Sequence, residues 1–111
     1  MINAMSSDNE RRSSPRVPFA SPITVRIDGE QHSCRTRDLG TGGIFVYFDG
    51  EPPKLDTKVA IELKLGETPE SLVFEGRVAR YGSGGNGIGV AFVEVSTEAR
   101  AQLSAYVATA I

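Results

Sequence analysis

Histidine and cysteine are almost absent from the sequence, which contains one residue of each, His32 and Cys34. A single cysteine cannot form an internal disulfide and fits a reducing compartment. The two residues lie two positions apart in one expected strand, no second His or Cys cluster could complete a metal site, and no nucleophile or acid accompanies His32. The sequence therefore predicts no catalytic residue, no metal and no bound cofactor, and we expect a protein that is not an enzyme.

Long apolar runs and an excess of positive charge are also lacking. No apolar stretch approaches the roughly 20 residues of a membrane-spanning helix, and the N-terminus has no apolar segment like that of a signal peptide. With 12 Lys+Arg against 14 Asp+Glu the net charge is −2, whereas non-specific nucleic-acid binding depends on positive charge. We therefore expect a soluble cytoplasmic domain, with neither a membrane nor a nucleic acid as partner.

The sequence has 111 residues, of which 40% are hydrophobic, and this is enough for one small domain with one core. Residues 1–16 are polar and rich in Ser, Asn and Arg, so they cannot bury enough surface to order themselves. We expect residues 1–16 to form a flexible arginine-containing N-terminal arm and residues 17–111 to form the folded domain.

Alternation of apolar and polar residues predicts β-strands through most of that domain. Residues 58–65 alternate most clearly, and residues 22–27 and 30–38 flank an Asp-Gly turn typical of a hairpin. Further strands are expected near residues 43–48, 71–82 and 87–95. The aromatic residues of these strands are expected to pack in the core: Phe45, Tyr47, Phe74 and Phe92.

The C-terminal stretch changes to helical spacing. Ser96 is a suitable N-cap and Glu98 would lie in the first turn, where the helix dipole favours a negative charge. We expect a helix over about 96–110. Six strands followed by one helix, with no βαβ alternation, predict a mostly-β protein: a small six-stranded antiparallel β-barrel with a C-terminal α-helix.

Arginine, by contrast, is concentrated near the N-terminus, while lysine appears only later in the chain. The expected arm contains Arg11, Arg12 and Arg16. Arg35 and Arg37 follow on the second expected strand. The planar guanidinium group grips phosphate and guanine edges in a way that lysine does not, so this distribution suggests an anionic ligand.

The stretch "RDLGTGG" directly follows these arginines. Its glycines either allow a turn or let another group approach the backbone closely, and an ordinary glycine-rich turn is equally compatible with them. The carboxylate of Asp38 could pair with N1–H and N2–H₂ of a guanine, while arginine takes N7 and O6. Together the arm and this turn suggest a ligand that carries both guanine and phosphate.

These two stretches resemble the signatures of the PilZ domain family. "RSSPR" reads Arg-x-x-x-Arg, and "DLGTGG" reads Asp-x-Gly-x-x-Gly where the family has (Asp/Asn)-x-Ser-x-x-Gly. "GIGVAFVEVS" is similar to the family's last barrel strand and the start of its C-terminal helix. The resemblance extends from about residue 11 to the end of the chain.

The resemblance implies a bacterial receptor for the second messenger cyclic di-GMP, in which the ligand orders the arm and the new surface engages an unidentified protein effector. By match to the motifs, Arg12 and Arg16 would clamp the ligand, Asp38 would accept from guanine and Gly43 would keep the turn open. Arg11, which precedes the motif, could add a phosphate contact.

One position departs from the family pattern, because Gly40 stands where the motif has serine. The missing hydroxyl costs about 0.5–1.5 kcal/mol for a neutral hydrogen bond and about 1.5–3 kcal/mol for one to a charged phosphate. The alternative is therefore a degenerate PilZ adaptor that binds no cyclic di-GMP and works through protein–protein interaction. A third hypothesis, a small barrel that binds single-stranded nucleic acid, is disfavoured by the acidic composition.

Overall fold

The computed structural model describes residues 16–66 and 70–110. Arg11 and Arg12, and with them most of the expected arm, lie outside the described residues. The elements in chain order are β1 (Arg16–Pro18), β2 (Pro22–Ile27), β3 (Glu30–Gly40), β4 (Gly43–Tyr47), β5 (Lys58–Leu63), β6 (Leu72–Tyr81), the 3₁₀ helix η1 (Ser83–Gly85), β7 (Gly87–Val93) and α2 (Thr97–Ala110).

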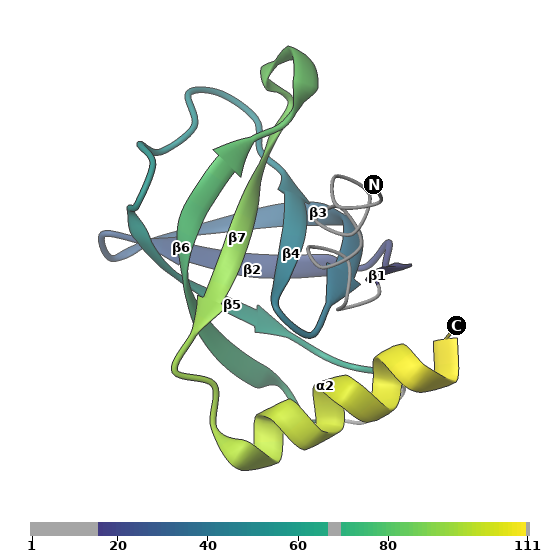
Figure 1. Ribbon diagram of the computed structural model, residues 1–111. Helices are drawn as coiled ribbons and strands as arrows, with labels where there is room; N and C mark the ends of the chain where they lie inside the picture. Colours follow the sequence, from purple (N-terminus) through teal and green to yellow (C-terminus); the bar gives the residue numbers. More distant parts are fainter. Residues whose placement is uncertain (1–15, 67–69, 111) are drawn as a thin grey trace, which may run out of the picture.

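The strands form one antiparallel sheet in the order β1-β3-β2-β5-β6-β7-β4, and pairing of β3 with β4 closes β2 to β7 into a six-stranded barrel (Figure 1). The predicted fold class, a mostly-β barrel with a C-terminal helix, is confirmed. The additional strand β1 was not expected. It pairs with the end of β3, where Arg16 lies opposite Gly40 and Pro18 opposite Asp38.

Strand alternation accounts for the core. In β5 the side chains of Val59, Ile61 and Leu63 are buried, while the residues between them are partly exposed. The turn between β2 and β3 has positive φ at both Asp28 (52°) and Gly29 (83°), as the two-residue hairpin turn that suits the strand twist requires.

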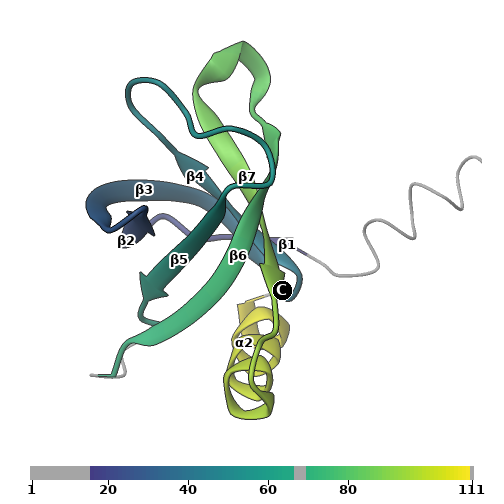
Figure 2. The ribbon, with the colours of Figure 1, turned by 90° about the vertical axis from the view of Figure 1, so that its left-hand side faces the viewer.

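Helix α2 closes one end of the barrel and lies below it in both views (Figures 1 and 2). Its first turn is capped as expected, because the Ala99 N–H donates to Ser96 Oγ at 3.1 Å. Ala99, Leu103 and Val107 are buried against the barrel core, and the ring of Tyr106 meets that of Phe19 edge-on at 5.6 Å. Within residues 16–66 and 70–110, no helix is long and apolar enough to cross a membrane.

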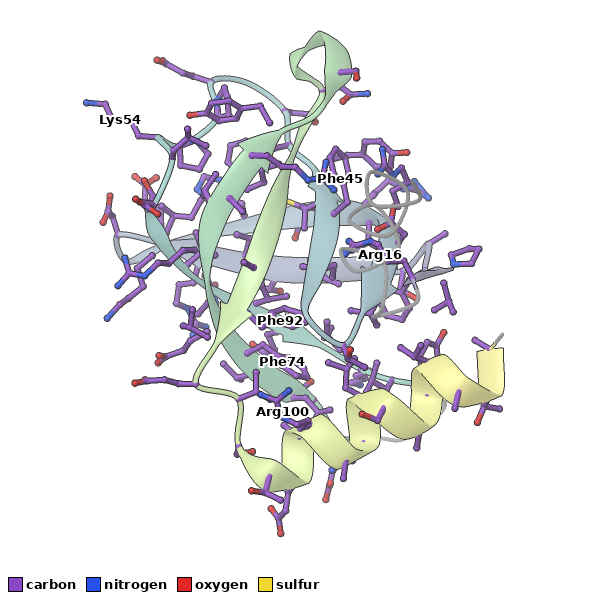
Figure 3. The ribbon with its side chains drawn as sticks, in the orientation of Figure 1. Arg16, Phe45, Lys54, Phe74, Phe92 and Arg100 are labelled. Atoms are coloured by element: carbon purple, nitrogen blue, oxygen red, sulfur yellow. The ribbon has the colours of Figure 1, made fainter. Side chains whose placement is uncertain are left out.

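The four strand aromatics do not all pack as expected. Phe74 is buried in the core, and Phe92, which is partly buried, stacks on it at 4.8 Å (Figure 3). Phe45 is fully buried but lies on the outer side of β4, between two residues whose side chains point inward, and Tyr47 is 38% exposed. The difference follows from strand geometry, because alternate residues of β4 face opposite sides of the sheet.

A buried threonine fixes the position of β1. Thr36 of β3 is the one buried polar residue in the described part of the chain. Its hydroxyl accepts from the Ser21 N–H at 3.2 Å and donates to the carbonyl of Phe19. Thr36 therefore holds the bend between β1 and β2, so that both strands pair with the same edge of β3 and Arg16 comes to lie beside its end.

Strands β4 and β7 approach each other closely at Gly43. A Cβ atom added there would lie 2.4 Å from the carbonyl oxygen of Val90, which belongs to the backbone and cannot move aside alone. At the neighbouring Gly42 an added Cβ would meet nothing within 4 Å, and neither glycine has a left-handed φ. The glycine at position 43 is therefore required by the closure of the barrel.

Replacing Gly43→Ala should lower the free energy of unfolding by about 1–3 kcal/mol, because the new methyl group overpacks a rigid contact. Gly42→Ala is the matched control and should change stability little. Chemical denaturation of the three proteins measures both effects. Equal stability of the two variants would contradict the assignment of Gly43 to barrel closure.

Candidate functional site

Two residues that the sequence separates by 22 positions meet at the end of β3. Arg16 Nε and Nη2 both lie 2.6 Å from Oδ1 of Asp38. The other carboxylate oxygen, Oδ2, accepts from Arg37 Nε at 2.7 Å. Each oxygen of Asp38 is therefore held by a different arginine, in the charge-assisted geometry that gives the stronger hydrogen bonds in proteins.

The surroundings of Asp38 favour its charged form. Its side chain is 18% exposed, and those of Arg16 and Arg37 are 35% and 48% exposed. Partial burial would by itself raise the pKa of the Asp38 carboxyl, but the hydrogen bonds and positive charges of Arg37 and Arg16 outweigh it and hold that pKa below its ordinary value. Asp38 is therefore a carboxylate at neutral pH and a pure hydrogen-bond acceptor.

A β-bulge brings these groups together. The register between β3 and β4 shifts at Arg37, so that Thr36 pairs with Val46 and Asp38 with Phe45. Regular alternation after Thr36 would turn the side chain of Asp38 into the barrel. The extra residue gives that inward position to Leu39 instead, and Arg37 and Asp38 both lie on the outer side.

A second bulge lies three strands away from β3, between Val78 and Arg80 of β6, and in the same way turns a residue outward, here Arg80. The pairings connect Asp38, Phe45, Gly89 and Arg80 in one row across β3, β4, β7 and β6. Both bulges therefore act on the same row. The first turns Asp38 to the outer side of the barrel next to Arg37, and the second turns Arg80 to that side.

Phe45 is the aromatic centre of that row. The guanidinium carbon of Arg37 lies 4.0 Å from the centre of its ring and that of Arg80 lies 5.7 Å away. Arg16 lies on the same side of the barrel as Phe45 (Figure 3). Because Phe45 is fully buried, its ring supports the arginines through cation–π contacts and offers no free face for a ligand to stack on.

Beside the row is a small hollow, here called the glycine hollow, with a volume of about 140 Å³. Pockets that take a whole drug-sized ligand measure about 300–1,000 Å³, so the glycine hollow has room for one group of a larger ligand. It is lined by Arg16, Gly42, Gly43, Ile44, Ala79, Arg80, Gly89, Val90 and Ala91.

The structure brings together four of the six site residues that the sequence predicted. Arg16 and Asp38 are in contact, and Gly40 is buried at the end of β3 opposite Arg16. Gly43 lies at the rim of the glycine hollow, although its missing side chain makes room for β7. The remaining two, Arg11 and Arg12, lie outside the described residues.

Sequence reasoning did not connect Phe45, Gly89 or Arg80 with this site, and it noted Arg37 only as one of the concentrated arginines before Asp38. A signal was present in "CRTRDL". Cys34, Thr36 and Leu39 are the buried residues of this stretch, and the change of spacing from two to three indicates a bulge. The second bulge has no such signal, because Ala79 can face either side of a sheet.

The remaining residues singled out in the sequence lie elsewhere. Arg35, His32 and Cys34 line a different hollow, with Phe48 and Asp49. Burial, with a smaller effect of Asp49, raises the pKa of the Cys34 thiol, which disfavours the reactive thiolate. Among residues 16–66 and 70–110, no group of three or more His, Cys, Asp and Glu side chains could hold a metal ion.

The lowered pKa of Asp38 predicts a pH-dependent contribution to stability. The carboxylate stabilises the fold above the ordinary aspartate pKa of about 3.9, and this contribution is lost as the pH falls through the lower folded-state pKa. Asp38→Asn should therefore reduce the free energy of unfolding by on the order of 1 kcal/mol near pH 7, and the difference from the unmodified protein should shrink below about pH 4. Urea denaturation at several pH values measures it.

Glu51→Gln, at an exposed position in the loop after β4, is the control and should leave stability nearly unchanged. A loss in Asp38→Asn that stays constant across the pH range would contradict the electrostatic explanation.

Solved structures share this barrel. The PilZ domain of CeSA from a cellulose-synthesizing bacterium has a TM-score of 0.66 and 27% identity, over 86% of this chain and 97% of that chain. The PilZ domain of YcgR from Escherichia coli, solved with c-di-GMP, has a TM-score of 0.67 and 18% identity, over 90% and 91%. The inhibitor of motility MotI/DgrA from Bacillus subtilis has a TM-score of 0.74 and 17% identity, over 89% of this chain and 50% of that chain.

This chain therefore spans about half of the MotI/DgrA chain. No curated protein matches it. The family model described as "PilZ domain" matches residues 10–109, a range that includes the barrel, all but the last residue of α2 and both predicted motifs. On this match and on the closed six-stranded barrel, the chain belongs to the PilZ domain family.

Proposed function

We propose that the chain is a receptor domain for cyclic di-GMP. The observation that carries the proposal is the contact of Arg16 with Asp38 at 2.6 Å, because it joins the two motifs at one place on the barrel. Membership of the PilZ family and the c-di-GMP in the YcgR structure support the same ligand. The site offers a carboxylate acceptor and positive charge, and cyclic di-GMP offers the matching groups, a planar donor edge and negative charge.

The chemistry of the site suits a guanine nucleotide. Asp38 is a pure acceptor, and the N1–H and N2–H₂ donors of guanine form the same paired arrangement as Nε–H and Nη2–H of an arginine. In the ligand-free protein Arg16 supplies those donors. Guanine would replace Arg16 on Asp38, and the released guanidinium group would then be free to bind phosphate or the N7 and O6 edge of the base.

This exchange would make the domain a switch. A ligand that takes Asp38 from Arg16 changes the contacts of the residue where β1 begins, and Arg11 and Arg12 precede it in the chain. Ligand binding would thus reposition the N-terminal arm and present a new surface to an effector protein. The ligand can shift this equilibrium only by the difference in its affinity for the two arrangements.

The direct test is an NMR titration of the labelled domain with cyclic di-GMP. Saturable shifts are expected for the amides of residues 10–17 and 37–44. Arg12→Ala and Arg16→Ala should each weaken binding by about 1.5–3 kcal/mol, roughly ten- to a hundredfold, because each removes a charge-assisted contact. Arg26→Ala removes the same charge from the exposed side of β2 and should bind as the unmodified protein does.

The adaptor hypothesis makes the opposite forecast. If neither segment shifts at high ligand excess while the barrel remains folded, the domain does not bind cyclic di-GMP, and the proposal fails. Unchanged affinity in both arm variants would equally contradict the proposed clamp, even if the ligand binds.

Gly40 allows a test of the departure from the family motif. It pairs with Arg16 across β1 and β3, so a hydroxyl at this position would lie next to the proposed clamp. Gly40→Ser should tighten binding by about 0.5–1.5 kcal/mol, roughly two- to tenfold, if it restores a neutral hydrogen bond. Isothermal titration calorimetry of both proteins measures the change, and equal or weaker affinity in the variant would show that the missing hydroxyl is not what limits binding.

A further inference from the structure

Arg80 is an arginine whose charge has no counter-ion among the described residues. The ion pairs in that part of the chain involve Arg16, Arg37 and His32, not Arg80. Its described contacts are with the Phe45 ring, at 5.7 Å, and with Gly89, over which its side chain passes. Arg80 therefore presents an uncompensated positive charge at a fixed place on the barrel.

That place is one wall of the glycine hollow. Arg16 and Arg80 line the hollow together, and no carboxylate is among the lining residues. The other lining residues include three glycines and two alanines, which keep side chains away from the space between the two arginines: Gly42, Gly43, Gly89, Ala79 and Ala91. Such a lining favours an anion that approaches the backbone closely.

We propose that the glycine hollow binds a phosphodiester group of the cyclic dinucleotide and that Arg80 donates hydrogen bonds to its oxygens. This inference rests on the proposed function and adds to it a ligand-contacting residue from β6, a strand that contributes nothing to either motif. Arg80 would act opposite Arg16, so that the two guanidinium groups hold the phosphodiester between them.

A phosphodiester fits the hollow better than a base does. The volume of about 140 Å³ accommodates a single group. Arg80, together with Arg16 once the base has taken its place on Asp38, gives the hollow a positive charge that selects an anion. A base would find no aromatic face to stack on, because the Phe45 ring is fully buried and already covered by Arg37. In this proposal the base therefore binds at Asp38 and the phosphodiester binds in the glycine hollow.

The fold holds Arg80 in this position through two features. The bulge at Ala79 turns Arg80 to the outer side of β6. Gly89, opposite Arg80 on β7, leaves the path of its side chain open, because a Cβ atom there would lie 2.9 Å from Cγ and 3.1 Å from Nε of Arg80. Both features direct the guanidinium group toward the hollow before any ligand arrives.

The test compares Arg80→Gln with Arg26→Gln in calorimetric titrations with cyclic di-GMP at low and high salt. Glutamine keeps much of the aliphatic stem that covers Gly89 and removes both the charge and the planar guanidinium fork. Arg80→Gln should weaken binding by about ten- to a hundredfold, and its affinity should depend less on salt than that of the unmodified protein. Arg80→Lys, which keeps the charge but not the planar fork, should lose less.

Gly89→Ala tests the same inference without changing any charge. The three atoms nearest to its added methyl group would all belong to the Arg80 side chain, which can swing away, so the barrel should keep its thermal stability. Displacement of Arg80 from the hollow should nevertheless weaken binding by about tenfold or more.

The outcomes separate this inference from the proposed function. Binding by the unmodified protein, with affinity lost in Arg80→Gln and Gly89→Ala but not in Arg26→Gln, supports both. Binding that Arg80→Gln leaves unchanged overturns the role of Arg80 and leaves the receptor function standing. No binding by the unmodified protein overturns the receptor function, and the inference about Arg80 falls with it.

Discussion

The site depends on one irregularity in β3, the bulge at Arg37. Upstream of it, β3 pairs with β2 and turns Cys34 and Thr36 into the barrel. Downstream of it, the side chain of Leu39 points into the barrel, and the charged side chains of Arg37 and Asp38 lie on the outer side. A regular strand would bury Asp38 among apolar side chains, where an unpaired carboxylate is strongly unfavourable. One extra residue thus moves Asp38 from a core position to the outer side, beside two arginines, while Leu39 takes its place in the core.

The carboxylate of Asp38 already has a full set of partners in this structure. Asp38 is shared by two arginines, and Arg37 also lies over the Phe45 ring. A ligand must therefore offer at least what Arg16 offers now, because leaving a partly buried carboxylate short of donors is costly. This requirement favours a guanine, which replaces the donors of Arg16 in kind, over a base whose edge presents fewer donors. In the proposed function, specificity would come from the replacement of Arg16 by guanine on Asp38, and affinity would come from the contacts that the released Arg16 makes with the ligand.

The sequence predicted the elements that follow a regular pattern, the strands and the helix, and missed the two β-bulges that interrupt strand alternation. Alternation located the barrel strands, and helical spacing with Ser96 located α2 and its cap. Phe45 was placed in the core because its strand is apolar, yet residues on both faces of β4 are buried, one side by the core and the other by arginines. The role of Arg80 depends on a register shift between β6 and β7, a tertiary fact that no local pattern in "RVARYG" contains.

Gly43 and Gly89 serve different purposes at this site, and only Gly43 belongs to the family motif. Gly43 is a motif residue, but its missing side chain accommodates the Val90 carbonyl, so its first role is to let β4 and β7 close the barrel. Gly89 lies outside the motif, and its missing side chain accommodates Arg80. A chain can therefore keep the motif glycine for the fold alone, without binding anything. The motif glycine therefore does not by itself mark a receptor. In the proposal made above, the charge that a phosphodiester requires comes from Arg16 and Arg80, which line the glycine hollow.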